Sequence, residues 1–117
     1  MLFSHEHWCE VTPIDGGLRA TLLFPASWPV FAAHFPGLPV VPAWVLIGAV
    51  RALAEERVKR PLLLDGLERA KLVRPVGPDE RVSIEVKLER QGDGWRARAQ
   101  LSSAAGSVGS IALALSE

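Results

Sequence analysis

The stretch that decides the fold is HFPGLPVVPAWVLIGAVRAL, residues His34–Leu53. Its first half is rich in proline, and from Pro42 it begins a helix whose first two turns carry no polar side chain. Proline suits the first turn of a helix, because the N–H that it lacks would have no partner there. The helix is expected to run to about Lys59 and to stop before Pro61. A helix that is apolar on every side is predicted to lie in the middle of a core.

His34 stands shortly before this helix, on a segment too rich in proline and glycine to be regular. Turns of this kind hold a side chain at a fixed angle, and the start of a helix is its positively polarised end. Taken alone, His34 reads as a hydrogen-bonded polar residue in a turn. Together with the buried helix that follows, it is predicted to belong to a catalytic site.

The composition indicates one compact domain, residues 1–117. Formal net charge is zero and no basic run is present, so nothing indicates nucleic acid as a partner. The single cysteine, Cys9, excludes an intrachain disulfide and favours a reducing compartment, and on a strand it is expected to be a small buried residue. No signal peptide is recognised, and prolines interrupt the uncharged stretch before it could span a membrane. We expect a cytoplasmic protein.

The rest of the chain reads as strands around the helix. A short helical turn is expected at Pro29, and Asp15-Gly16-Gly17 closes a hairpin before it. A long strand with an irregularity at Gly66 follows the helix. The expected strands are 8–14, 18–24, 62–76, 81–90, 95–103 and 107–115. An antiparallel sheet must cover one face, so we predict an α+β fold in which the sheet wraps the single long helix.

Two segments resemble one family. The first is His34-Phe35-Pro36-Gly37-x-Pro39-x-x-Pro42, which is similar to the signature of the 3-hydroxyacyl-acyl-carrier-protein dehydratases of fatty-acid synthesis. The second, residues 70–79 (AKLVRPVGPD), is similar to the segment that this family carries on the long strand after its helix. The resemblance implies the hot-dog fold, in which one antiparallel sheet wraps a central helix.

The resemblance also implies the chemistry. It makes His34 the base that removes the C2 proton of a 3-hydroxyacyl thioester, and the backbone N–H of Ala43 the donor to the thioester oxygen. It makes the backbone carbonyl of Val40 the acceptor that orients the His34 ring. Ala43 stands where the family usually has glycine, which keeps the N–H but narrows the approach.

Substrate contacts are expected at Phe35, Gly37, Trp44 and Gly48. Gly48 is a departure, because the family has Glu or Asp at this helix position, fourteen residues after the histidine. Glycine inside a helix costs roughly 0.5–1 kcal/mol relative to alanine, so either close packing or room for substrate or a water would explain it. No other residue plainly replaces the missing acid. Glu55 and Glu56 are expected to lie too far along the helix, and Asp65 and Glu68 read as edge charges.

The loss of the acid makes this chain more similar to the dehydratase-like proteins of aryl-polyene and related polyketide clusters than to the housekeeping dehydratases. Three functions remain open: a dehydratase (a lyase) acting on an acyl carrier protein or acyl-CoA substrate, a non-catalytic subunit that binds acyl thioesters or supports an active paralogue, and an acyl thioesterase. No cofactor is expected beyond the phosphopantetheine that carries the substrate, and no metal is expected, since His5 and His7 lack a third ligand.

Further features concern partners. Arg51, or the basic residues Arg69, Lys71 and Arg74, could contact a carrier phosphate or an acidic carrier protein, although surface charges of this kind are common. The aromatic residues Trp28, Phe31 and Trp44 could line an acyl slot or belong to the core. A single sheet around one helix leaves a long edge strand unpaired and a pocket open on one side. The resemblance implies a homodimer or larger assembly, and assembly with a different partner subunit is kept as an alternative.

Overall fold

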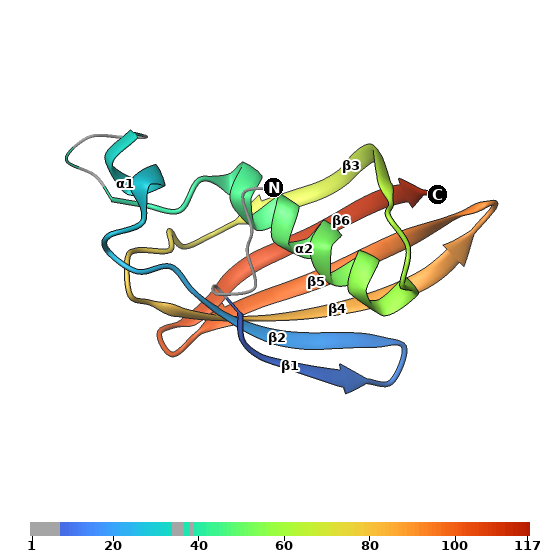
Figure 1. Ribbon diagram of the computed structural model, residues 1–117, viewed down its shortest axis with the longest axis horizontal. Coiled ribbons are helices and arrows are strands. Elements are labelled where there is room, and N and C mark those ends of the chain that lie inside the picture. Colours follow the sequence, from blue (N-terminus) through green and yellow to red (C-terminus); the bar gives the residue numbers. More distant parts are fainter. Residues whose placement is uncertain (1–7, 34–36, 38) are drawn as a thin grey trace.

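The computed structural model describes residues 8–33, 37 and 39–117. One antiparallel sheet curves around a single long helix (Figure 1). The elements in chain order are β1 (Trp8–Ile14), β2 (Gly17–Leu23), α1 (Pro29–Ala33), α2 (Ala43–Val58), β3 (Leu63–Leu72), β4 (Arg81–Gln91), β5 (Gly94–Ser103) and β6 (Gly106–Ser116). These elements confirm the predicted order of strands and helices.

The six strands lie in the order β1-β2-β4-β5-β6-β3, and every neighbouring pair is antiparallel. Two hairpins, β4–β5 and β5–β6, form the centre of the sheet, where alternating apolar residues face the helix. Ile84, for example, is opposite Leu101, and both are buried. The edges of the sheet are therefore β1 and β3 (Figure 1).

The helix α2 begins and ends where the sequence predicts. Pro42 is its N-cap residue, and the helix closes at Lys59, whose left-handed backbone lets its N–H donate to the carbonyl of Glu55. Such a left-handed residue commonly ends a helix, and Pro61 prevents its continuation. Six residues of α2 are buried against the sheet: Val45, Leu46, Ala49, Val50, Leu53 and Ala54.

The prediction that α2 lies in the middle of a core is confirmed for the face that packs on the sheet and is wrong for the opposite face of its first turns. Trp44 is 41% exposed and Gly48 is half-buried, so one face of the first two turns is open. The sheet reaches only one side of the helix, and no second layer among the described residues covers the other. The open face is apolar, which a soluble domain rarely leaves uncovered over a large area.

Two smaller predictions are also wrong. The strand after the helix ends at Leu72 rather than Val76, because Val73 makes a last bond to Val108 and Pro75 has no N–H to extend the pairing. Cys9 is exposed rather than buried, since it lies at a register shift of the edge strand β1. The irregularity predicted at Gly66 is confirmed, with shifts at 64/66 and again at 67/69.

No helix among the described residues is both long and apolar enough to cross a membrane.

Candidate active site

The site begins at the first turn of α2. Ala43 is its first residue and is exposed, and no side chain caps the helix at Pro42. The first N–H groups of a helix have no partner within it, and they lie at the positive end of the helix dipole. The Ala43 N–H therefore lies at the positively polarised start of α2, on an exposed residue.

The segment that leads into α2 is held in place by a hydrogen bond at the end next to the helix. Val41 is buried, and its N–H donates to the carbonyl of Val76 at 2.8 Å. Val40 next to it is half-buried, and Gly37 is an exposed turn residue with a φ of 81° that favours glycine. The predicted base His34 and the predicted substrate contact Phe35 lie outside the described residues.

Trp44 and Gly48 are four residues apart on α2 and therefore share its open face. Arg51, one turn further, does not extend toward a ligand: its Nε donates to the backbone carbonyl of Leu62 at 2.8 Å. The predicted helix contacts thus lie together on one apolar face, and the structure gives Arg51 a role in holding the start of β3.

Trp28 and Phe31, the other two aromatic residues considered for the site, lie in a cluster apart from Trp44. Trp28 stacks on buried Phe24 with a centroid distance of 4.7 Å and meets Phe31 edge to face at 5.5 Å. This cluster seats α1 against the core and accounts for Trp28 and Phe31 as packing residues.

The carboxylates considered as substitutes for the missing acid are engaged elsewhere. Glu55 accepts a bond from the Leu62 N–H at 2.9 Å, and Glu56 pairs with Lys59. On β3, Asp65 accepts from the Ser116 hydroxyl and Glu68 lies 2.7 Å from Arg96. Each of these contacts lies on the surface or at the junction of α2 and β3, away from the first turn of α2.

Sequence reasoning missed the importance of the turn at residues 76–80. Its Asp79 accepts a bond from the Ala26 N–H, and its Glu80 accepts one from the Gly77 N–H. The motif Gly77-Pro78-Asp79-Glu80 signalled a turn, and its neighbourhood resembled the family, but neither signal indicated which segment the turn would contact.

The basic residues Arg69, Lys71 and Arg74 are exposed around the end of β3. Arg69 donates to the hydroxyl of Ser110, whereas arginines farther along the sheet, such as Arg19 and Arg96, pair with Glu85 and Glu68. This corner of the described structure therefore carries positive charge without a bonded acid.

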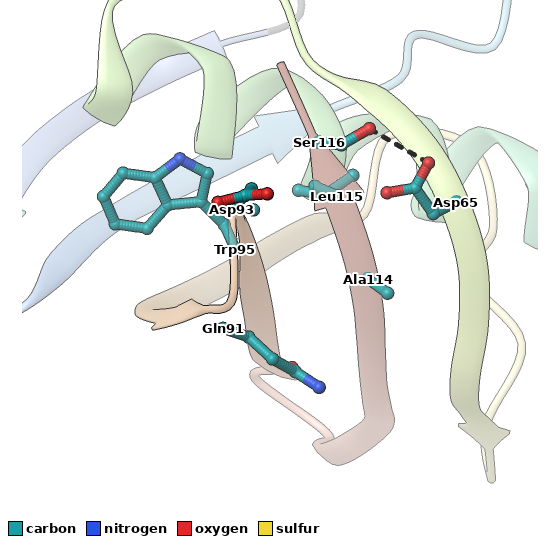
Figure 2. Close-up of a pocket in the computed structure, with 8 residues that line it drawn as sticks. Asp65, Gln91, Asp93, Trp95, Ala114, Leu115 and Ser116 are labelled. Carbon is teal, nitrogen blue, oxygen red and sulfur yellow. Dashed lines mark hydrogen bonds between the residues drawn. The ribbon is translucent and has the colours of Figure 1, made fainter.

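A cavity of about 300 Å³ lies at the end of the sheet that is away from the first turn of α2 (Figure 2). Figure 2 shows Asp65 and Ser116 pointing toward one another on neighbouring strands, joined by a hydrogen bond. The lining residues are Asp65, Gln91, Asp93, Gly94, Trp95, Ala114, Leu115 and Ser116. The cavity lies beyond the C-terminal end of α2, a helix about 24 Å long, and contains none of the predicted site residues. Within the described ranges, no three histidine, cysteine or acidic side chains gather in a way that could hold a metal ion.

Comparison with known structures defines the class of fold. The chain superposes on the dehydratase heterocomplex ApeI:P from Xenorhabdus doucetiae with a TM-score of 0.78 and 16% identity, covering 94% of this chain and 96% of that one. It also superposes on an (R)-hydratase from A. caviae involved in PHA biosynthesis, with a TM-score of 0.61 and 16% identity over 87% of this chain and 95% of that one. The protein has the hot-dog fold, as the resemblance implied.

Sequence comparison defines the family. Residues 12–108 match the model of the ApeI-like family, described as ApeI dehydratase. Among curated relatives, the 3-hydroxyacyl-[acyl-carrier-protein] dehydratases FabZ from Chloroflexus aggregans and Pelotomaculum thermopropionicum are 33% and 36% identical over 90 residues, which cover 69% of this chain. The chain belongs to the ApeI-like dehydratase family. The alignments span 62% and 64% of these two relatives, less than two thirds of their length.

Proposed function

We propose that this protein removes water from a 3-hydroxyacyl thioester, or adds water in the reverse direction. The observation that carries the proposal is the uncapped start of α2, which comes five residues after the sequence His34-Phe35-Pro36-Gly37. Membership of a dehydratase family supports the reaction class.

In the proposed reaction the His34 imidazole takes the C2 proton, and the electron pair of that C–H bond forms the C2–C3 double bond. The C3–O bond breaks, and the leaving hydroxide takes a proton from a water or another group to depart as water. Negative charge develops on the thioester oxygen meanwhile. The Ala43 N–H stabilises it, and the Val40 carbonyl orients the imidazole.

Gly48 favours a second candidate, a non-catalytic subunit. A glycine provides no proton donor where the resembling dehydratases have a carboxylate, and a hot-dog relative of similar shape is part of a dehydratase heterocomplex. In this alternative the chain binds the acyl thioester or supports a paralogue that carries the complete set of catalytic groups.

The substrate is proposed to arrive on a phosphopantetheine arm, on either an acyl carrier protein or CoA. The exposed basic residues Arg69, Lys71 and Arg74 support this proposal, because phosphate groups and acidic protein surfaces are attracted to such a corner.

A second copy is proposed to pair along β3. All but one (Val11 on β1) of the exposed large hydrophobic side chains of the described residues lie there or on the open face of α2: Trp44, Leu63, Leu64, Leu67, Leu72 and Val73. Leu64 and Leu67 lie opposite buried Leu115 and Leu113, so they face the same side as the core but extend beyond it.

The charges on β3 suit an antiparallel copy of the same strand. Asp65 lies in its first half, and Arg69 and Lys71 lie in its second half, where the one acid, Glu68, is paired with Arg96 of β5. Antiparallel pairing sets the first half of one strand beside the second half of the other, so acid meets base. Covering the exposed edge in this way would also satisfy its unpaired backbone groups.

The reaction is tested by incubating the purified protein with 3-hydroxyacyl and 2-enoyl thioesters on CoA and on a carrier protein. We expect interconversion that His34→Ala abolishes. Thioester binding without turnover would favour the non-catalytic subunit, and release of free thiol would indicate a thioesterase.

A further inference from the structure

The turn between β3 and β4 bonds the chain on both sides of position 34. Val76 accepts from the Val41 N–H at 2.8 Å, after position 34. Before it, the Asp79 N–H donates to the Phe24 carbonyl at 2.8 Å, and the Asp79 carboxylate accepts from the Ala26 N–H at 3.2 Å. One five-residue turn therefore fixes both ends of the segment that carries His34.

The backbone of Asp79 has a conformation that is unusual for a residue other than glycine. Its φ is 59°, in the left-handed region that favours glycine and that aspartate and asparagine tolerate better than most residues. In this conformation Asp79 makes two hydrogen bonds to residues 24–26. Its backbone N–H donates to the Phe24 carbonyl, and its carboxylate accepts from the Ala26 N–H. Disfavoured backbone conformations persist where the surrounding structure holds them, and they gather at functional sites.

The remainder of the turn is rooted in the core. Val76 is 1% exposed and Phe24 is fully buried, so both anchor points are fixed. The Gly77 N–H donates to the Glu80 carboxylate at 3.1 Å, which closes the turn on itself. Gly77 also lies beside the Pro39 carbonyl, since a Cβ placed on Gly77 would stand 3.9 Å from it. The turn thus joins the segment that leads into α2 to the buried core.

We propose that Asp79 is a positioning residue, which sets the His34 segment relative to the Ala43 N–H at the start of α2. The inference rests on the proposed role of His34 as base. Asp79 acts through its bonds to Phe24 and Ala26 and does not itself touch substrate.

Two substitutions separate positioning from general stability. Asp79→Gly removes the carboxylate but suits the left-handed backbone, so the turn keeps its shape. Asp79→Asn keeps both an acceptor oxygen and tolerance of this backbone. The measurements are kcat and KM for an enoyl thioester, the ¹H–¹⁵N spectrum of the His34 ring, and the amide exchange rate of Ala26. The His34 ring signals are identified by their loss in His34→Ala.

We expect Asp79→Gly to lower kcat about tenfold or more while KM stays nearly unchanged. The His34 ring signals should shift, and Ala26 exchange should become faster. Asp79→Asn should restore all three. His34 signals unchanged in Asp79→Gly would overturn the inference, as would a loss of kcat that Asp79→Asn shares. If the unaltered protein has no turnover, the proposed function fails, and the His34 and Ala26 signals still decide the role of Asp79.

Discussion

At the scale of single residues, the proposed chemistry depends on two positions of α2 that are expected to differ from the resembling dehydratases. Ala43 keeps the backbone N–H that a thioester oxygen needs, whereas Gly48 lacks the carboxylate that a leaving hydroxyl would use. The two changes have different consequences. The first preserves the proposed electrostatic stabilisation, and the second removes a proton donor from a half-buried position on the helix.

Restoring a carboxylate tests the meaning of Gly48. Gly48→Glu should raise kcat/KM for dehydration about tenfold or more, because a positioned general acid contributes on the order of 10²–10⁴-fold. Gly48→Gln is the matched control, since it adds similar bulk without an ionisable group. Both variants should keep α2, as glycine is a poor helix former. Equal rates in folded Gly48→Glu and Gly48→Gln would show that position 48 is not the place of the acid.

At the scale of elements, α2 is joined to β3 by side chains as well as by the chain itself. Leu62 is 1% exposed, and both its backbone groups are bonded: its N–H to Glu55 and its carbonyl to Arg51. Buried backbone groups are costly to leave unpaired, so Glu55 and Arg51 together fix where β3 begins relative to the helix.

Glu55→Ala should therefore destabilise the protein by about 1–3 kcal/mol, because it leaves the Leu62 N–H without its acceptor. Glu56→Ala is the control, since the adjacent Glu56 makes only an exposed pair with Lys59 and should change stability by less than about 0.5 kcal/mol. Urea unfolding measures both. Similar midpoints for the two variants would contradict the role given to Glu55.

The elements also show what sequence could and could not predict. The helix bounds followed from Pro42 and Pro61, two central strands from their alternation and the other strands from β-forming residues and turn signals, because these are local properties of the chain. An open side of the fold could be predicted, but the exposure of Cys9 and Trp44 in particular could not, since it depends on how far the sheet reaches. The anchoring of residues 24–26 by Asp79 joins segments over 50 residues apart, and no local pattern encodes it.

The candidate site also contains some residues that sequence could place and others that it could not. Ala43 and Val40 lie at the start of α2 because Pro42 sets that start, which sequence could predict. The roles of His34 and Phe35 came from a family resemblance and stay predictions. The role of Arg51 as a contact for Leu62 required the three-dimensional arrangement.

At the scale of the whole molecule, the two edges of the sheet differ. Five exposed large hydrophobic residues lie on β3 and at its end, whereas β1 contributes Val11. The β1 edge also contains Pro13, which blunts strand pairing. The asymmetry favours association through β3 and the adjoining open face of α2.

Leu67→Asp on β3 should dissociate the protein into single chains, because it places a charge in the middle of the proposed contact. Val11→Asp is the matched control on β1, where the side chain is similarly exposed, at 44% against 50% for Leu67. Sedimentation equilibrium should give a dimer for the unaltered protein and for Val11→Asp. A monomeric unaltered protein, or a dimer that survives Leu67→Asp, would refute pairing through β3.

The measurement that tests the central claim most directly is kcat of Ala43→Pro beside Ala43→Gly. Proline at the first helical position is tolerated, and Pro42 already has the extended backbone, with ψ at 148°, that a residue before proline adopts. The substitution therefore removes one N–H and leaves α2 in place, which circular dichroism can verify. We expect Ala43→Pro to lower kcat about 10²–10³-fold, and Ala43→Gly, which keeps the N–H, to stay close to the unaltered protein. A folded Ala43→Pro variant with full kcat would contradict the claim that this amide stabilises the reacting thioester.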